Sequence, residues 1–179
     1  MGKAIIPILI EKGYTLALQA DSRAAELKTF LVDNGLTNCA VFESSLDDEL
    51  ACMKLVDRVE AELGKISFLV NNAGINRTAS SHKLAASDWN AVLNLNLTIP
   101  FLLSKIVSKQ MIEDGFGRIV HISSVVGSIP VAGTAVYAAS KAGLMGLARA
   151  QSADWAKYGI TVNCIAPGYL DKGMIEQVP

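Results

Sequence analysis

The sequence lacks the features that mark secreted, membrane-spanning or strongly nucleic-acid-binding proteins. It has only three cysteines in 179 residues and no C-x-x-C pair, which argues against a disulfide framework or a structural zinc and for a reducing, cytoplasmic compartment. Its 16 basic and 17 acidic residues give a net charge of -1, which attracts neither nucleic acid nor an anionic membrane. No apolar run approaches the roughly 20 residues of a membrane-spanning helix. Function is therefore expected to depend on a local site.

Two kinds of catalytic centre also lack their residues. The only histidines are His82 in a polar loop and His121 in an apolar strand, and neither has paired carboxylates. We therefore expect no metal site and a structural role for both histidines. No G-x-S-x-G sequence surrounds Ser123 or Ser124, which argues against a hydrolase triad.

The residues that are present favour a packed α/β protein. Hydrophobic residues make up 51% of the chain and the mean hydropathy is +0.34, as in a globular domain. Strand-like stretches lie at 14–19, 39–42, 66–70, 118–122 and 160–165. Helical patterns alternate with them, at 3–11, 22–34, 47–64, 87–113 and 135–157. This alternation predicts a doubly wound α/β fold, with helices on both faces of a parallel sheet, in a single domain over residues 1–179.

Polar residues cluster where four of the predicted strands end. They are Ser44-Ser45, Asn71-Asn72, Ser123-Ser124 and Pro167-Gly168. In open parallel sheets, ligands bind beyond the carboxyl ends of the strands. The clustering therefore predicts an active site at this edge of the sheet.

The sharpest chemical feature is Tyr137-Ala-Ala-Ser-Lys141 in a predicted helix. Residues four apart share one helix face, so the phenol of Tyr137 and the ammonium of Lys141 can point at one pocket. A nearby cation stabilises phenolate, and we expect it to lower the Tyr137 pKa and make a general acid or base near neutral pH. Ser124 lies 13 residues earlier, directly after a strand, where its hydroxyl can hold a substrate oxygen. An ordinary surface pair is the alternative, since Y-x-x-x-K alone is a weak signal.

Five motifs, in their order and spacing, resemble the short-chain dehydrogenase/reductase family. They are N-N-A-G at 71–74, N-L-T at 96–98, I-S-S at 122–124, Y-A-A-S-K at 137–141 and V-N-C-I-A-P-G at 162–168. Within the family, the chain is most similar to 3-oxoacyl-(acyl carrier protein) reductases and acetoacetyl-CoA reductases. The resemblance implies an NAD(P)-binding, Rossmann-like domain that transfers hydride between a nicotinamide cofactor and a carbonyl or alcohol, with reduction of a 3-oxoacyl thioester as the expected reaction.

The resemblance also implies a role for individual residues. Tyr137 would protonate the carbonyl oxygen, Lys141 would lower the Tyr137 pKa and bind the nicotinamide ribose, and Ser124 would orient the substrate. Asn96 would hold a water that links Lys141 to bulk solvent. The expected cofactor-binding residues are Asp21, Ser44, Ser45, Asn71, Ala73, Gly74, Tyr137, Lys141, Pro167, Gly168 and Leu170.

The chain is shorter than the family pattern at both ends. The family begins with a strand and a T-G-x-x-x-G-I-G turn that binds pyrophosphate, and Gly2 matches only the last of these glycines. The chain also ends at Pro179, before the family's last helix and strand. We therefore expect a partial domain, from a fragment or mis-started product of a normal reductase. The alternatives are a degenerate, non-catalytic member that acts as an interaction subunit, and a deliberately truncated or rearranged protein.

Cofactor preference and substrate carrier depend on single positions. At the end of the 14–19 strand, an acidic residue would select NAD and an arginine would select NADP. Asp21 lies one position after the usual place of the NAD-selecting acid, and Arg23 follows close by. The resemblance to the reductases favours NADP(H) over NAD(H). Acyl carrier protein is a candidate partner. Two positions that are basic in those reductases are Gly115 and Tyr158 here, so a CoA thioester or another small ketone is the alternative.

The two long predicted helices indicate a subunit interface. They carry more apolar residues than one side of a sheet needs, and family members pair these helices. We expect a homodimer or homotetramer, with an interface that includes Phe101, Leu102, Leu144, Leu147 and Ala148.

Overall fold

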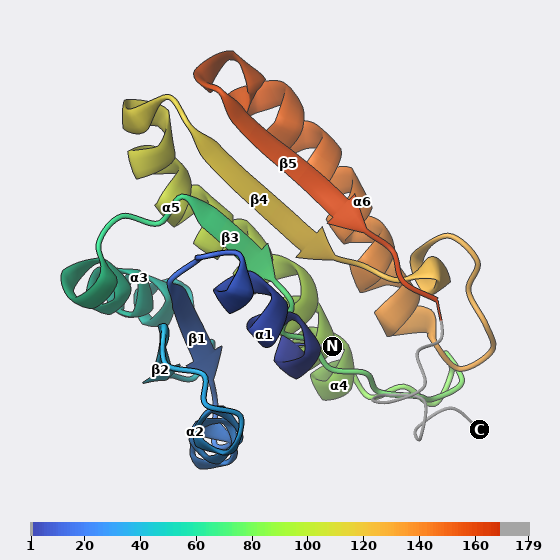
Figure 1. The fold of residues 1–179 in the computed structure, drawn as a ribbon. Coiled ribbons are helices and arrows are strands. Elements are labelled where there is room, and N and C mark those ends of the chain that lie inside the picture. Colours follow the sequence, from blue (N-terminus) through green and yellow to red (C-terminus); the bar gives the residue numbers. More distant parts are fainter. Residues whose placement is uncertain (1, 169–179) are drawn as a thin grey trace. The chain divides into compact units, whose positions relative to one another are not determined.

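The computed structural model describes residues 2–168 and divides the chain into two compact units, Met1–Lys65 and Ile66–Pro179. Each unit contains parallel strands and helices, as the alternation in the sequence predicts (Figure 1). The units are described separately below.

The first unit is a two-stranded parallel sheet with helices before, between and after its strands. Its elements are α1 (Gly2–Glu11), β1 (Leu16–Ala20), α2 (Ala24–Asp33), β2 (Cys39–Glu43) and α3 (Glu49–Leu63). Strand β1 pairs with β2 so that Leu16 lies opposite Cys39 and Ala20 opposite Glu43. Both strands therefore end at the same edge, and the residues that follow them are neighbours.

One buried cluster of the first unit lies on one face of this sheet. Ile6 of α1 and Leu27 and Leu31 of α2 are buried together, and they pack against alternate strand residues that include Leu18 and Val41. Alternate residues of a strand point to the same face, so the strand sequences L-x-L and C-x-V supply this apolar surface.

Helix α3 begins and ends at residues of the expected kind. The Asp48 carboxylate accepts a hydrogen bond from the backbone N–H of Ala51 at 2.8 Å, which satisfies one of the free donors of the first turn. Gly64 ends the helix with a φ of 84°, a backbone conformation that favours glycine.

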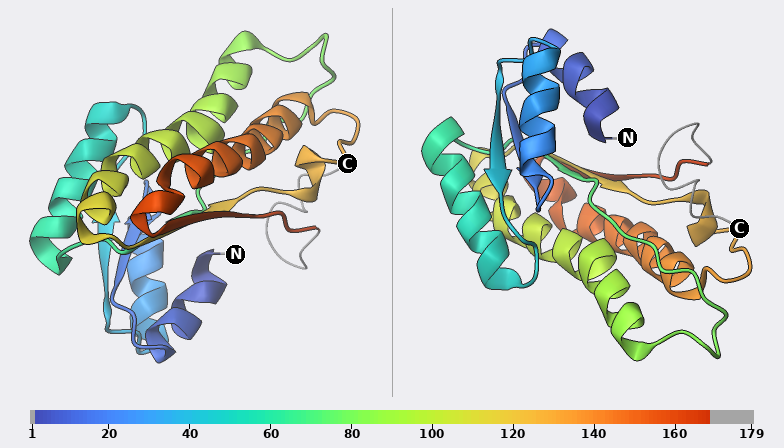
Figure 2. Two further views of the ribbon diagram at one scale, coloured as in Figure 1. Left: turned by 90° about the horizontal axis from the view of Figure 1, so that it is seen from above. Right: turned by 90° about the horizontal axis from the view of Figure 1, so that it is seen from below.

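The second unit is a three-stranded parallel sheet in the order β3–β4–β5. Its elements are β3 (Phe68–Asn71), α4 (Ala86–Leu93), a π-helical turn (Asn94–Thr98), α5 (Ile99–Asp114), β4 (Gly117–Ile122), a 3-10 turn (Val125–Gly127), α6 (Ala135–Trp155), a second 3-10 turn (Ala156–Tyr158) and β5 (Ile160–Ile165). Helices α5 and α6 lie side by side on one face of the sheet (Figures 1 and 2). They bury Ile119, His121, Ile160 and Val162, which point to that face.

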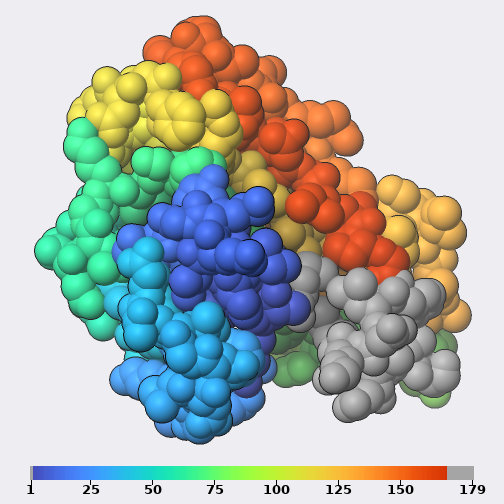
Figure 3. Space-filling model, viewed as in Figure 1, coloured from blue at the N-terminus to red at the C-terminus, as the bar shows by residue number. Residues whose placement is uncertain are grey.

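The opposite face of this sheet is more open. Thr161, Asn163 and Ile165 alternate with the buried residues of β5 and are exposed, and β5 reaches the surface on this side (Figure 3, red). Phe68 and Val70 of β3 are also exposed. Within the second unit, the described helices α5 and α6 therefore cover one face only.

The helical stretch Ala86–Asp114 is long and apolar enough to cross a membrane by length and composition. Half of the tested window is buried inside the structure, as in a core helix of a globular protein. Buried residues such as Val107 and Met111 face the sheet rather than the outside.

The α/β class and the parallel pairing are confirmed, and β5 lies where the sequence predicts it. Two expectations differ from the structure. The described strands form two sheets, because β1 is paired only with β2 and β3 only with β4. The helix predicted over 87–113 is interrupted by the π-helical turn. The single domain over residues 1–179 stays a prediction.

Candidate active site

Ser124, Tyr137 and Lys141 meet at the carboxyl end of β4 in the second unit. Ser124 follows the strand and caps the 3-10 turn Val125–Gly127, where its hydroxyl accepts from the backbone N–H of Val126 at 3.2 Å. Tyr137 and Lys141 lie one turn apart on α6. The side chains of Tyr137 and Ser124 are hydrogen-bonded, and the Lys141 ammonium lies 5.5 Å from the centroid of the Tyr137 ring. The helix spacing has thus placed phenol, ammonium and hydroxyl together, as predicted.

Lys141 is a buried cation that is held at two points. Lys141 is only 4% exposed, and its Nζ donates a hydrogen bond to the Ile122 carbonyl at 2.7 Å. The Ser123 hydroxyl donates to the backbone carbonyl of Lys141 at 2.7 Å, which ties α6 to the end of β4. Burial lowers the pKa of Lys141 to about 8, since a charged amine is penalised away from water. The Ser123 hydroxyl thus helps to fix the position of Lys141.

The pKa of Tyr137 differs from the sequence-based expectation. Burial raises it above its ordinary value, and the hydrogen bond with Ser124 offsets only part of this rise. The expected lowering by Lys141 is wrong for this structure. The Lys141 ammonium is 5.5 Å from the ring centroid and donates to the Ile122 carbonyl. Desolvation of the half-buried phenol therefore has the larger effect.

Asn96 lies in the π-helical turn and is fully buried. Its side-chain oxygen accepts from the backbone N–H of Ile75 at 2.9 Å, and its amide donates to the Ile75 carbonyl at 2.9 Å and to Ser140 Oγ at 3.1 Å. Ser140 in turn donates to the Tyr137 carbonyl at 2.8 Å. Asn96 thus joins the loop after β3 to α6. Together with Ser124, Tyr137 and Lys141 it forms the tetrad of predicted catalytic residues. Single π-helical turns are frequent at functional sites, and a regular helix pattern did not predict this one.

Gly74 brings the loop after β3 against two members of the tetrad. A Cβ at this position would lie 3.1 Å from Asn96 Oδ1 and 3.5 Å from Lys141 Nζ. The backbone of residues 72–74 can approach so closely only because glycine has no side chain. Ala73, also expected to bind the cofactor, is exposed beside it.

Asn71 is placed differently from the other expected cofactor residues. It is 7% exposed and lies at the end of β3, with its side chain on the face covered by helices. Its amide nitrogen is 3.3 Å from Ser104 Oγ and 3.1 Å from His121 Nδ1. These two contacts use both amide hydrogens inside the protein.

The end of β5 lies beside Ser124. The backbone N–H of Ser123 donates to the Ile165 carbonyl at 2.7 Å, and that of Val125 donates to the Pro167 carbonyl at 3.0 Å. Pro167 and Gly168 are therefore next to Ser124, the serine that we predict to be catalytic, and Gly168 has open space around it. Leu170 lies outside the described residues.

Asp21, Ser44 and Ser45 lie together in the first unit, after β1 and β2. The Ser44 N–H donates to the Ala20 carbonyl at 3.0 Å, which joins the two strand ends. Asp21 accepts from the backbone N–H and from Nε of Arg23, each at 3.2 Å. The backbone N–H of Arg23 is the largest cause of a lowered Asp21 pKa. Asp21 and Ser45 are exposed and Ser44 is half-buried at the carboxyl edge of their sheet, where a ligand of the first unit would bind.

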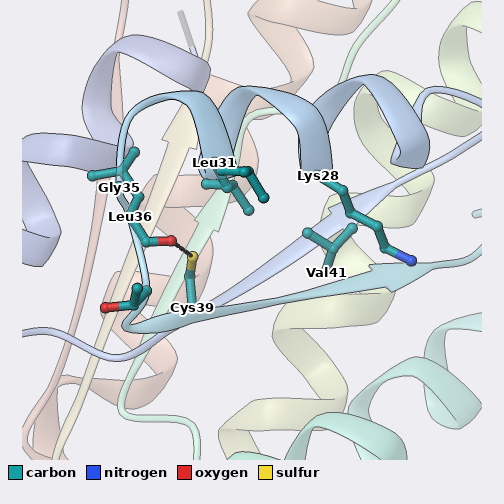
Figure 4. Close-up of a pocket in the computed structure, with 8 residues that line it drawn as sticks. Lys28, Leu31, Gly35, Leu36, Cys39 and Val41 are labelled. Carbon is teal, nitrogen blue, oxygen red and sulfur yellow. Dashed lines mark hydrogen bonds between the residues drawn. The ribbon is translucent and has the colours of Figure 1, made fainter.

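A separate groove of about 550 Å³ lies between α2 and β2 (Figure 4). Its walls are mainly apolar side chains such as Leu31 and Val41, with the Lys28 ammonium at one end. Cys39 lies in the wall and its thiol contacts the Leu36 carbonyl at 3.5 Å. None of the predicted site residues lines this groove. Among residues 2–168 there is also no group of three His, Cys, Asp or Glu side chains that could hold a metal ion.

Comparison with known proteins gives consistent matches over the whole chain. A family model described as short chain dehydrogenase matches residues 1–179. An acetoacetyl-CoA reductase of Shinella zoogloeoides is 40% identical over 179 residues, 100% of this chain and 73% of that protein. A 3-oxoacyl-(acyl carrier protein) reductase of Vibrio harveyi is 36% identical over 178 residues, 98% of this chain and 71% of that protein. The crystal structure of a gluconate 5-dehydrogenase from Burkholderia cenocepacia, in complex with NADP and tartrate, matches with a TM-score of 0.87 and 32% identity over 96% of this chain and 68% of that one.

Proposed function

Because the chain belongs to the short-chain dehydrogenase/reductase family, an oxidoreductase family, we propose that it reduces a 3-oxoacyl thioester with NADP(H), using Tyr137 as the general acid. The observation that carries the proposal is the cluster of Ser124, Tyr137 and Lys141 at the end of β4. Single serines, tyrosines and lysines are common on protein surfaces. In this cluster the three side chains lie together, partly buried and hydrogen-bonded, which suits proton transfer to a substrate oxygen.

Each member of the cluster has a chemical task in this proposal. Ser124 orients the substrate carbonyl toward Tyr137, whose hydroxyl it already contacts. Tyr137 donates its proton to the carbonyl oxygen and takes it back in the reverse reaction. The Lys141 ammonium would attract the phenolate that remains, but by less than burial penalises it, so the pKa of Tyr137 stays above its ordinary value. Asn96 fixes the loop after β3 and, through Ser140, the first turns of α6.

The raised pKa of Tyr137 keeps the phenol protonated at neutral pH, which is the form that reduction of a carbonyl requires. The reverse reaction requires the phenolate, which burial makes less favourable. The pKa of a catalytic group does not change the equilibrium, so the direction of the reaction depends on the concentrations of substrate and cofactor.

Each unit by itself has residues that suit a part of a dinucleotide. In the second unit, Gly74 brings its backbone close to Asn96 and Lys141. In the first unit, the exposed Asp21 and Ser45 and the half-buried Ser44 follow the strand ends at the carboxyl edge of the sheet. Bound NADP(H) supplies the hydride. Lys141 would bind the ribose, residues 73–74 and 167–168 would border the cofactor, and Asn71 would hold the end of β3 in place. We propose NADP over NAD because the Arg23 guanidinium stands beside Asp21 and can meet a 2′-phosphate.

The substrate class rests on the similar reductases and on one apolar loop. Val125, Ile129 and Val131, which follow Ser124 in the chain, are all exposed. Such side chains suit an acyl chain next to the reacting carbonyl. We propose a CoA or acyl carrier protein thioester as the carrier, with the former favoured because Gly115 and Tyr158 replace basic residues of the carrier-protein-dependent pattern.

We also propose a homo-oligomer in the cytoplasm. Phe101 on α5 is exposed and available for an interface, whereas Leu144 and Ala148, expected in it, are buried within the chain. The interface would therefore use the remaining outward residues of α5 and α6. Three free cysteines, one of them fully buried, are typical of a reducing compartment.

The test is Tyr137→Phe, which removes the proton donor and leaves the ring. We expect the turnover of acetoacetyl-CoA with NADPH to fall by at least about 100-fold, the usual contribution of a general acid, with a nearly unchanged thermal midpoint. The matched control is Tyr158→Phe, which removes a hydroxyl from an exposed tyrosine of the same unit. Equal turnover of both variants and the parent protein would refute the role of Tyr137. A folded protein without nucleotide binding would instead support an interaction subunit.

A further inference from the structure

A row of buried polar side chains crosses the second unit behind the candidate active site. Ser104 on α5, Asn71 on β3, His121 on β4 and Gln151 on α6 are each at most 7% exposed. Apolar residues would fill this space without needing hydrogen-bond partners, so polar side chains here are costly unless they bond to one another. Its contacts leave little choice of arrangement.

The hydrogen positions in this row follow from one end. The Ser104 hydroxyl donates its only hydrogen to the Pro100 carbonyl at 2.6 Å, so it can only accept from Asn71 Nδ2 at 3.3 Å. The atom of Asn71 that faces His121 Nδ1 at 3.1 Å is the same nitrogen, which donates. His121 Nδ1 must then be an unprotonated acceptor.

The other end of the row follows from this assignment. With Nδ1 unprotonated, the hydrogen of the neutral imidazole lies on Nε2, and it is donated to Gln151 Oε1 at 3.0 Å. The amide nitrogen of Gln151 is consequently turned away and is without a partner among the described residues. One tautomer of neutral His121 therefore satisfies every contact in the row. A second proton would place an N–H against the N–H of Asn71.

The row reaches the candidate site through Asn71. This residue ends β3, and three positions later Gly74 meets Asn96 and the Lys141 ammonium. We propose that His121 is a positioning residue, which in its neutral form holds Asn71 and so fixes the cofactor-facing turn 72–74 beside Lys141. The inference rests on the proposed function, because it assumes that this turn borders the cofactor.

The surroundings of His121 oppose its protonation. Burial of the ring is the largest cause of its lowered pKa, the Gln151 contact on α6 raises the pKa, and the charge of Lys141 on the same helix lowers it further. On β5 the residue paired with it is Cys164, a thiol whose pKa is raised by burial. The polar groups of the row on α5 and β3 are Ser104 and Asn71, which do not titrate. Protonation is therefore expected only below the ordinary histidine range.

Two conservative variants separate the two ring nitrogens. The amide of His121→Asn reaches about as far as Nδ1, so its oxygen can still accept from Asn71 while the contact with Gln151 is lost. The amide of His121→Gln reaches about as far as Nε2, so it can still contact Gln151 while Asn71 loses its acceptor. We would measure the dissociation constant of NADPH by fluorescence titration between pH 5 and 8 for both variants and the parent, with the thermal midpoint of each.

The expected result is an asymmetry that stability does not explain. His121→Gln should bind NADPH about tenfold more weakly at pH 7, and His121→Asn within about twofold of the parent, although the latter also loses a buried hydrogen bond. The parent should lose affinity as the pH falls below the ordinary histidine range, and His121→Asn should not. Equal affinities of all three proteins at pH 7, losses that follow the thermal midpoints, or an acid loss of affinity that His121→Asn shares would each overturn the inference alone. Absence of NADPH binding by the parent would overturn the proposed function and this inference with it.

Discussion

The buried ammonium of Lys141 gives a prediction in which function and stability oppose each other. Its residue is 4% exposed, and burial lowers its pKa from 10.5 to about 8. The unfolded chain keeps this proton up to about pH 10.5, whereas the folded chain releases it above about pH 8. Between these values the unfolded state binds more protons, so the free energy of unfolding should rise with pH.

The size of the effect follows from the two pKa values. For a single group with these constants, the contribution of Lys141 should make the protein about 2 kcal/mol more stable at pH 9.5 than at pH 7. Lys141→Met keeps a stem of similar length and removes the charge, so it should remove this part of the pH dependence. At pH 7 the variant should be at least as stable as the parent, even though the Ile122 carbonyl loses its donor. Turnover should be lost.

The assay is urea unfolding of the cofactor-free protein at pH 7, 8, 9 and 9.5. The quantity of interest is the difference in unfolding free energy between parent and Lys141→Met at each pH, because the titration of all other groups then cancels. Lys157→Met, at an exposed lysine of the same unit, serves as the control for the loss of a lysine charge without burial. A parent-minus-variant difference that is flat from pH 7 to 9.5 would show that Lys141 is not a desolvated cation, and the argument for its action on Tyr137 would fail.

Two further substitutions test the surroundings of the cofactor. Gly74→Ala should lower NADPH affinity and turnover together, because the new Cβ would lie 3.1 Å from Asn96 Oδ1 and displace it or Lys141. Steady-state kinetics measure this. The control is Gly146→Ala on α6, where the new Cβ would be 3.9 Å from Arg149, an ordinary contact, and both quantities should stay unchanged. Arg23→Ala should shift the ratio of NADPH to NADH affinities toward NADH, since it removes the cation and frees Asp21 to accept from ribose hydroxyls. An unchanged ratio of NADPH to NADH affinities in competition titrations would show that Arg23 does not determine the cofactor preference.

Much of the fold was predictable from local pattern, and the misses have local causes. The strand Ile160–Ile165 and the end of α3 at Gly64 follow from short-range signals in the sequence. The π-helical turn was missed because one inserted residue changes the period of a helix without changing its composition. The two separate sheets depend on which strands find partners, and pattern along the chain does not specify this.

The candidate site was predictable as a set of residues but not in its electrostatics. Spacing placed Tyr137 and Lys141 on one helix face, yet the direction of the Tyr137 pKa depends on where the ammonium goes, and it goes to the Ile122 carbonyl. His121 was expected to be structural because it lies in an apolar strand. Its partners, Asn71 and Gln151, are 50 and 30 positions away, so only the folded structure reveals the row.

The polar side chains around this site bind the backbone as well as each other, and this constrains how their functions can be measured. Lys141 Nζ holds the carbonyl of Ile122, Ser123 holds the carbonyl of Lys141, and Asn96 holds both backbone groups of Ile75. Truncation to alanine would free a buried carbonyl or N–H in each case, at about 1 to 3 kcal/mol per group, in addition to removing the functional atom. Loss of activity in an alanine variant would therefore not separate a catalytic from a positional role. Substitutions that retain shape and change one atom or charge, such as Tyr137→Phe and His121→Asn against His121→Gln, can do so.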